Sequence, residues 1–215
     1  MHALNTILEK KLLAEKINQY IVHTPSIARK AKAGQFVILR LSDGGERVPL
    51  TIVDHDAEKG TITLIVQTVG KSTKMLDEIE PGEAIQDVLG PLGNPSEIEN
   101  FGRVAVIGGG VGAAVAFPVA KALKLAGNHV TAIVGARNKD LIILKPELEQ
   151  VTDRLLLTTD DGSYGLHGFV TDQLRMLLES GESFDYVLAI GPLFMMRAVA
   201  DLTRPYGIRT TVSLN

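Results

Sequence analysis

The stretch that decides the fold of this chain is Val104-Ala105-Val106-Ile107-Gly108-Gly109-Gly110-Val111-Gly112-Ala113-Ala114. Its apolar first half predicts a strand covered on both faces, and its last residues open an apolar helix. The glycines let the backbone approach a phosphate closely, and the free N–H groups at the helix start face such an anion. The stretch predicts a dinucleotide-binding turn, although the motif alone is weak and also fits a tight turn without a ligand.

The next strand lacks a residue that the common dinucleotide fingerprint requires. That fingerprint has an acidic residue about 20 residues further on, where it holds a ribose hydroxyl. Here the strand Val130–Val134 is followed by Gly135-Ala136-Arg137-Asn138-Lys139. An arginine suits a phosphate or an adenosine ribose, and it also fits a plain surface charge. We therefore expect a pyridine-nucleotide pocket of a lineage different from ordinary Rossmann dehydrogenases.

Strands and helices alternate after Gly90-Pro91-Leu92-Gly93-Asn94-Pro95, which predicts an α/β domain over residues 97–215 with a doubly wound parallel sheet. The ligand of such a sheet lies at the carboxyl ends of its strands. The predicted strands are Arg103–Gly108, His129–Val134, Arg154–Thr158, Tyr186–Ile190 and Ile208–Val212. The predicted helices are Val111–Ala126, Pro146–Val151, Phe169–Glu179 and Pro192–Thr203.

Short strands with turn signals at close spacing fill residues 1–96, which predicts a small antiparallel β-barrel domain. Pro49 lacks a ladder donor, so its strand is expected at an edge where a ligand lies alongside. One short helix, Ser72–Ile79, is expected to be capped by Ser72 or Thr73. The predicted strands are Lys10–His23, Gln35–Leu41, Pro49–Val53, Thr61–Thr68 and Ala84–Val88.

A second glycine-containing corner, Val69-Gly70-Lys71-Ser72-Thr73, follows a strand of this barrel. Its backbone N–H groups and hydroxyls fit a second anion site, and they also fit an ordinary capped helix start. Two pyrophosphate-binding corners on one chain suggest two dinucleotides.

Two further loops reach the carboxyl ends of the predicted sheet, Thr158–Gly165 and Gly191–Met196. Asp160 and Asp161 fit a solvated turn or an Asx turn better than a metal pair, because no nearby residue completes a hard-cation shell. None of the five histidines pairs with a Ser or Asp at a catalytic spacing. We assign no catalytic residue and no metal ligand.

The composition narrows the class of protein. The 215 residues are 45% hydrophobic and 22% charged, with a formal net charge of -3, which is typical of a globular protein and does not favour nucleic acid as a partner. No apolar run approaches the roughly 20 residues of a membrane span, and the first residues do not form a signal peptide, so a cytoplasmic location is expected. Because the chain has no cysteine, these residues cannot ligate an iron–sulfur cluster through thiolates.

Seven motifs occur together along nearly the whole chain: Arg47-Val48-Pro49-Leu50-Thr51, Val69-Gly70-Lys71-Ser72-Thr73, Gly90-Pro91-Leu92-Gly93, Gly108-Gly109-Gly110-Val111-Gly112, Gly135-Ala136-Arg137, Thr159-Asp160-Asp161-Gly162-Ser163-Tyr164-Gly165 and Gly191-Pro192. In this order they resemble the ferredoxin–NADP reductase superfamily. Within it the chain is similar to the small FAD subunits of NADH-dependent reduced ferredoxin:NADP oxidoreductase and to the electron-transfer subunit of dihydroorotate dehydrogenase.

The resemblance implies an FAD-binding barrel followed by an NAD(P)-binding domain. The residues it implies for FAD are Val48, Pro49, Leu50 and Thr51 along the flavin ring and ribityl chain, Ile65, Val66 and Gln67 on the adenosine side, and Gly70, Ser72 and Thr73 at the pyrophosphate. Those it implies for NAD(H) or NADP(H) are Gly109, Gly110, Val111, Gly112, Arg137, Asp161 and Gly191. Members of the family continue into a cysteine-rich [2Fe–2S] tail, so such a cluster is expected only if a cysteine-bearing tail exists beyond Asn215.

Three functions are consistent with these residues. The first, which we favour, is an FAD-dependent subunit that transfers hydride between NAD(P)H and FAD and passes electrons to a larger flavin or iron–sulfur subunit, or to ferredoxin. The second is a nucleotide-responsive binding module without redox chemistry. The third is a stand-alone flavin reductase with a diffusible acceptor. The choice between NAD and NADP stays open, because Arg137 can receive a 2′-phosphate whereas similar subunits mostly use NAD.

Overall fold

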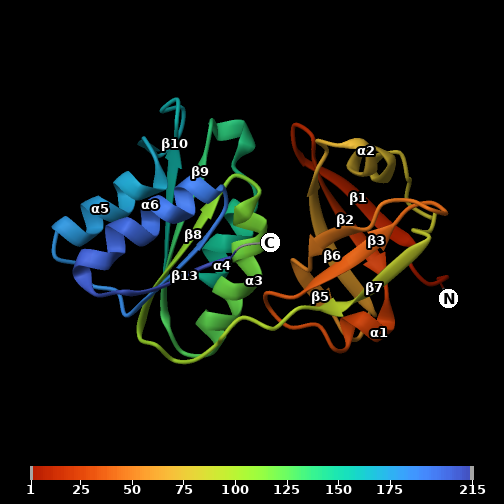
Figure 1. Cartoon of the computed structure of the whole chain (residues 1–215), viewed down its shortest axis with the longest axis horizontal. Helices are drawn as coiled ribbons and strands as arrows, with labels where there is room; N and C mark the ends of the chain where they lie inside the picture. The colour runs from red at the N-terminus through yellow and green to blue at the C-terminus, as the bar shows by residue number, and fades with distance from the viewer. Residues whose placement is uncertain (1, 214–215) are drawn as a thin grey trace. The chain divides into compact units, whose positions relative to one another are not determined.

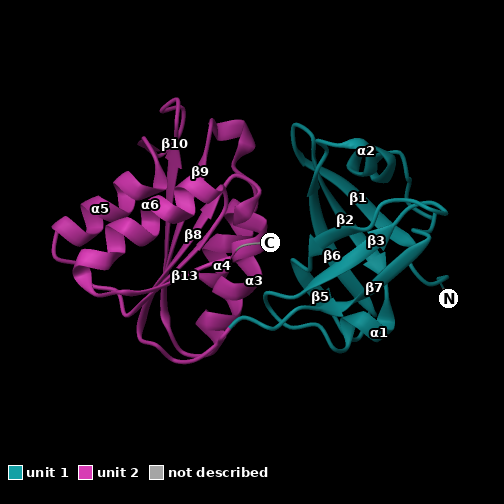
Figure 2. Ribbon diagram, in the orientation of Figure 1, with its two compact units in different colours: residues 1–96 teal, residues 97–215 magenta. Residues whose placement is uncertain are grey.

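The computed structural model describes residues 2–213, and the chain divides into two compact units, residues 1–96 and 97–215 (Figure 2). Each unit buries a hydrophobic core of its own, which is the packing requirement for a separate domain.

The first unit consists of two antiparallel sheets around one core (Figure 1). The strand order is β1-β2-β6-β5 in one sheet and β4-β3-β7 in the other. Tyr20 and Leu64 from the first sheet pack with Val37 and Leu39 from the second, so the predicted antiparallel fold of this half is confirmed. The elements are β1 Ile7–Ala14, β2 Ile17–His23, α1 Pro25–Ala28, β3 Phe36–Arg40, β4 Val48–Thr51, β5 Asp54–Asp56, β6 Thr61–Gln67, α2 Lys71–Asp77 and β7 Asp87–Leu92.

Two strand predictions in this unit are wrong. Lys10–His23 is not one strand but most of the β1–β2 hairpin, whose turn contains Lys16 in a left-handed conformation with φ of 59°. A hairpin turn without glycine, proline or asparagine gives no sequence signal. The strand predicted at Ala84–Val88 begins only at Asp87. Ala84 instead makes an isolated bridge to Thr6.

Pro49, which has no backbone N–H to donate, lies in an edge strand, where this absence costs little stability. Its strand, β4, is an edge of the three-stranded sheet and pairs only with β3, with Pro49 opposite Ile38. The predicted edge position is confirmed.

The second unit is a six-stranded parallel sheet with the order β11-β10-β9-β8-β12-β13. Helices α3 and α4 cover one face, and α5 and α6 cover the other (Figure 1). The strand order reverses between β8 and β12, so the crevice at their carboxyl ends is the expected ligand position. The predicted doubly wound sheet is confirmed. Its elements are β8 Arg103–Gly109, α3 Gly112–Leu125, β9 His129–Ala136, a 3-10 turn at Lys139–Leu141, α4 Lys145–Val151, β10 Arg154–Thr159, β11 Leu166–His167, α5 Val170–Glu179, β12 Tyr186–Ile190, α6 Leu193–Thr203, a second 3-10 turn at Arg204–Tyr206 and β13 Arg209–Val212.

The segment that joins the units is anchored at both ends. The Ser96 N–H donates to the Ala33 carbonyl of the first unit at 2.9 Å. Glu97 forms an ion pair with Arg209 of the second unit at 2.5 Å, and the Arg209 guanidinium also lies over the stacked rings of Phe101 and Tyr186.

No helix within residues 2–213 has the length and apolar character needed to cross a membrane.

Candidate functional site

The Gly108–Gly112 segment, which we call the glycine turn, leaves β8 and enters α3 at the point where the strand order reverses. A Cβ on Gly109 would lie 2.5 Å from the Met195 sulfur, and one on Gly112 would collide with the Ile190 carbonyl oxygen. Gly110 has open space around it but a φ of 58°. Gly112 packs tightly against the end of β12 and Gly109 against Met195 of α6, whereas backbone conformation favours glycine at position 110.

The hydrogen bonds around the glycine turn leave two of its backbone N–H groups without a partner among the described residues. The Gly110 N–H donates to the Gly135 carbonyl at 2.8 Å, and the Ala113 N–H donates back to Gly110 at 3.1 Å. Among the hydrogen bonds of residues 2–213, none engages the N–H of Val111 or Gly112, and both residues are partly exposed. Together with the dipole of the 14-residue helix α3, these two donors suit an anion.

The loop after β12 packs directly on the glycine turn. Gly191 has a φ of 155°, and a Cβ there would lie 2.9 Å from the Met195 methyl carbon and 3.2 Å from the Gly109 backbone nitrogen. Met195 is thus a core residue that fits between Gly109 and Gly191, which are distant in the sequence. Beside it, Leu193 and Phe194 leave 68% and 76% of their surface exposed.

The loops after β9 and β10 are joined to each other. The Asp161 N–H donates to the Arg137 carbonyl at 3.2 Å, and the Arg137 side chain is exposed. Asp161 accepts from the Ser163 N–H at 2.9 Å in an Asx turn, one of the two turn interpretations left open by the sequence. Hydrogen bonds from Ser163 lower the pKa of Asp161. Among residues 2–213, no three His, Asp or Glu side chains gather closely enough to hold a metal ion.

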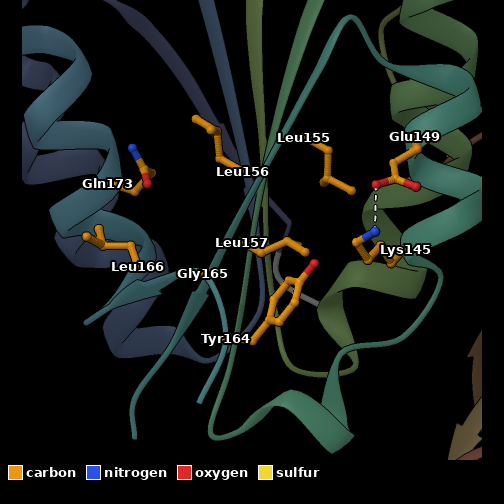
Figure 3. Close-up of a pocket in the computed structure, with 9 residues that line it drawn as sticks. All are labelled: Lys145, Glu149, Leu155, Leu156, Leu157, Tyr164, Gly165, Leu166 and Gln173. Atoms are coloured by element: carbon orange, nitrogen blue, oxygen red, sulfur yellow. Dashed lines mark ion pairs between the residues drawn. The ribbon is translucent and has the colours of Figure 1, made fainter. Parts of the chain in front are cut away.

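The end of the β10 loop borders a pocket on the α4 side of the sheet. The Thr159 hydroxyl donates to the Tyr164 carbonyl at 2.8 Å, which fixes the loop, and the Tyr164 ring lies beside Leu157 on the α4 side of the sheet (Figure 3). There it borders a shallow pocket of about 390 Å³ with the Lys145–Glu149 ion pair, whose interaction raises the pKa of Lys145.

In the first unit, Val69–Thr73, which we call the barrel corner, connects β6 to α2. The Thr73 hydroxyl accepts from the N–H groups of Val69 and Gly70, each at 3.0 Å, and donates to the Gly70 carbonyl at 3.1 Å. The predicted cap is therefore provided by Thr73, and its hydroxyl is fully used within the corner. Gly70 has a φ of -120° and no atom within 4 Å of a Cβ position.

Two further hydroxyls lie at this corner. The Ser72 hydroxyl donates to a Glu46 carboxylate oxygen at 2.5 Å, and the Thr68 hydroxyl is buried without a hydrogen-bond partner. An unpaired buried hydroxyl is costly, so Thr68 is a group that a ligand or water at the corner could satisfy. Neither Glu46 nor Thr68 was predicted, because no sequence spacing places a carboxylate 26 residues away on a serine.

The far end of α2 is fixed to the barrel. Asp77 accepts from the Asn18 amide at 2.8 Å and the Tyr20 hydroxyl at 3.4 Å, and it lies 3.5 Å from the Lys10 ammonium. Burial, followed by the Asp77 charge, raises the pKa of Tyr20 well above its usual value. These contacts hold α2, and with it the barrel corner, against β1 and β2.

In the two strands β4 and β6, some side chains pack in the core and others are exposed. Val66 lies in the core and Leu50 packs against it, whereas Pro49 and Gln67 are exposed. Ile65 is buried but lies outside the core cluster, as strand alternation requires. Because the side chains of Leu50 and Val66 pack in the core, these two residues would contact a ligand mainly through their backbone atoms.

The fold defines a class of two-unit proteins, in which two antiparallel sheets around one core precede a doubly wound parallel sheet. Residues 5–96 match the family model described as an oxidoreductase FAD-binding domain. The chain is 46% identical over 213 residues to a "dihydroorotate dehydrogenase B (NAD(+)), electron transfer subunit homolog" from Thermotoga maritima, covering 99% of this chain and 75% of the relative. It is 30% identical over 205 residues to the corresponding electron transfer subunit from Geobacillus thermodenitrificans, covering 93% and 78%.

A solved chain of the NADH-dependent reduced ferredoxin-NADP oxidoreductase superposes with a TM-score of 0.94 at 46% identity, covering all of this chain and 77% of that one. The chain therefore belongs to the family of FAD-binding electron-transfer subunits with a ferredoxin reductase-like fold. It spans about three quarters of the length of these relatives. The family, the fold class, the oxidoreductase class and FAD as cofactor, all predicted from the sequence, are confirmed.

Proposed function

We propose that the barrel corner and the glycine turn are the flavin and nicotinamide sites of a subunit that oxidises NAD(P)H and passes electrons to a larger partner subunit. The observation that carries the proposal is the pair of N–H groups at Val111 and Gly112 that have no partner among the described residues, in a chain whose residues 5–96 match an FAD-binding domain. The proposal places the reaction in the cytoplasm.

The first unit fits a flavin dinucleotide. Space around Gly70 lets a phosphate approach the backbone, and the unpartnered hydroxyl of Thr68 belongs to the residue just before the barrel corner. Ser72 would donate to the pyrophosphate, while Thr73 would act by shaping the corner. Val48, Pro49, Leu50 and Thr51 would line the flavin ring and ribityl chain, and Ile65, Val66 and Gln67 would border the adenosine.

The second unit fits a nicotinamide dinucleotide. The backbone of Gly109, Gly110, Val111 and Gly112 would hold its pyrophosphate, and Gly191 would let the nicotinamide approach the end of β12. The Arg137 side chain is free to reach an adenosine ribose or its 2′-phosphate, and Asp161 lies on the adjoining loop.

The absence of an assigned acid or base agrees with this chemistry. When bound, FAD supplies hydride acceptance from a nicotinamide and release of electrons one at a time, so the protein's part is to bind and orient. Backbone donors at the two corners fix the phosphates, and the packed Gly109, Gly191 and Met195 give one corner a rigid wall.

Reconstitution with FAD tests the proposal. We expect a yellow protein whose flavin absorbance bleaches when NADH is added without oxygen. A protein that binds NADH but takes up no flavin would favour the nucleotide-responsive module instead. Turnover with ferricyanide, but with ferredoxin only after a partner subunit is added, would favour the subunit over a stand-alone reductase. A cysteine-bearing tail beyond Asn215 lies outside the described residues, and a [2Fe–2S] cluster is proposed only with such a tail.

Arg137→Ala tests which nicotinamide nucleotide is used. If Arg137 contacts a 2′-phosphate, the substitution weakens NADPH binding about tenfold, which is the loss of one charge-assisted contact, and leaves NADH binding nearly unchanged. Lys139→Ala removes a charge from the same exposed loop and is the matched control. Titration of both nucleotides into each variant measures the effect, and an unchanged Kd for NADPH would show that Arg137 is no phosphate ligand.

A further inference from the structure

A carboxylate lies on the proposed flavin-phosphate site. Glu46 is exposed, belongs to the loop before β4, and reaches Ser72 of α2 with an oxygen-to-oxygen distance of 2.5 Å. Within residues 2–213 this carboxylate forms no ion pair, although the neighbouring Arg47 and the nearby Lys71 are both exposed. Among the described residues, its hydrogen-bond partner is the Ser72 hydroxyl.

Hydroxyl chemistry makes this contact and a phosphate contact exclusive. A serine hydroxyl has a single hydrogen, so Ser72 can donate to one acceptor at a time. An ionised carboxylate and a phosphate oxygen both accept only, and both are negative, so they also repel each other. Thr73 cannot replace Ser72 as a donor, because its hydrogen is directed to the Gly70 carbonyl.

We propose that Glu46 competes with the flavin phosphate for the Ser72 hydroxyl. It accepts the hydrogen bond from Ser72 in the flavin-free protein and releases it when FAD binds, and this competition lowers the FAD affinity. This inference rests on the proposed flavin site. In this proposal Ser72 binds the flavin phosphate, and Glu46 weakens that binding. Removing the competing charge should strengthen flavin binding, which is not expected of a residue that merely supports the fold.

The test is FAD titration of the flavin-depleted full chain, comparing wild type, Glu46→Ala, Glu46→Gln, Ser72→Ala and the Glu46→Ala, Ser72→Ala double variant. We expect Glu46→Ala to lower the Kd about three- to fivefold at low salt, the scale of an exposed charge interaction, and less at high salt. Glu46→Gln should give a smaller gain, because the neutral amide oxygen still accepts from Ser72 without the repulsion. Ser72→Ala should weaken binding and reduce the gain from Glu46→Ala in the double variant.

Glu58→Ala is the matched control. It removes the same charge from an exposed turn before β6, at the opposite end of that strand from the barrel corner, and should leave the Kd unchanged. An unchanged or weaker affinity in Glu46→Ala would overturn the competitor role. Absence of FAD binding in every protein, the wild type included, would instead overturn the proposed flavin site. Circular dichroism of each variant separates either result from misfolding.

Discussion

The barrel corner and the glycine turn have similar sequences, each a strand followed by glycine and a helix, but different forces hold them. The barrel corner is held by side chains: the Thr73 hydroxyl binds two backbone N–H groups, and Ser72 binds Glu46. The glycine turn is held by close backbone packing. Gly109 and Gly112 have no side chains, so they can pack directly on the start of α6 and the end of β12. Gly70, which has open space around it, and Gly112, which the packing requires, therefore look alike in sequence and differ in their surroundings.

The largest expected effect is that of Gly112→Ala. The added methyl group would collide with the Ile190 carbonyl and lie 3.0 Å from the Gly191 Cα, and neither backbone atom can move alone. We expect a loss of about 3 kcal/mol in the free energy of unfolding of the second unit, together with loss of nucleotide binding. Gly110→Ala has open space but a φ of 58°, so it is the control and should cost about 1 kcal/mol. Urea denaturation followed by circular dichroism measures both, and equal costs would contradict the packing argument.

The next effect is that of Thr73→Val at the barrel corner. Valine keeps the shape but removes the acceptor for the Val69 and Gly70 N–H groups, so the first unit should lose about 1 kcal/mol. Thr73→Ser keeps the hydroxyl and should retain most of that stability. Hydrogen exchange at the two amides reports the change locally, and unaltered protection in Thr73→Val would mean that the hydroxyl does not hold the corner.

The third substitution, Gly70→Ala, is expected to affect FAD binding and not the stability of the fold. With a φ of -120° and no neighbour within 4 Å, alanine fits, and the free energy of unfolding should change by less than about 0.5 kcal/mol. FAD should nevertheless bind about tenfold more weakly, because the methyl group occupies the approach of a phosphate to the backbone. Wild-type FAD affinity in this variant would show that the flavin does not approach Gly70.

The smallest expected effect is that of Asp161→Asn. Hydrogen bonds from Ser163 place the folded-state pKa of Asp161 below its usual value, so its carboxylate stabilises the folded state at neutral pH. That contribution is lost as the pH falls through the lowered pKa. Wild type should therefore melt slightly above Asp161→Asn at neutral pH, and the difference should vanish in strong acid. A difference independent of pH would show that the carboxylate charge does not matter.

Strand and helix periodicity predicted the second unit closely. Tyr186–Ile190 was predicted with its observed bounds, and the helices near α3, α5 and α6 differ only at their ends. Buried parallel strands are apolar throughout and are separated by helices long enough to show their period. The two-residue strand β11, which is too short to show any period, was not predicted.

The first unit and the site details were harder to predict, since they depend on contacts that sequence spacing does not encode. The β1–β2 turn uses Lys16, and α1 and β5 are three or four residues long. The residues of the glycine turn alone identify it, but the contact between Met195 and Gly109 joins distant parts of the sequence and has no sequence signal.

The anchors on either side of the joint between the units have a consequence for gene architecture. Ser96 is bound by its backbone to Ala33, and Glu97 by its side chain to Arg209, so adjacent residues belong to different halves. A recombination event between these two codons would leave each half with its own terminal anchor. We therefore expect the peptide bond between Ser96 and Glu97 to be a position at which one unit can be exchanged while the other keeps its own anchor.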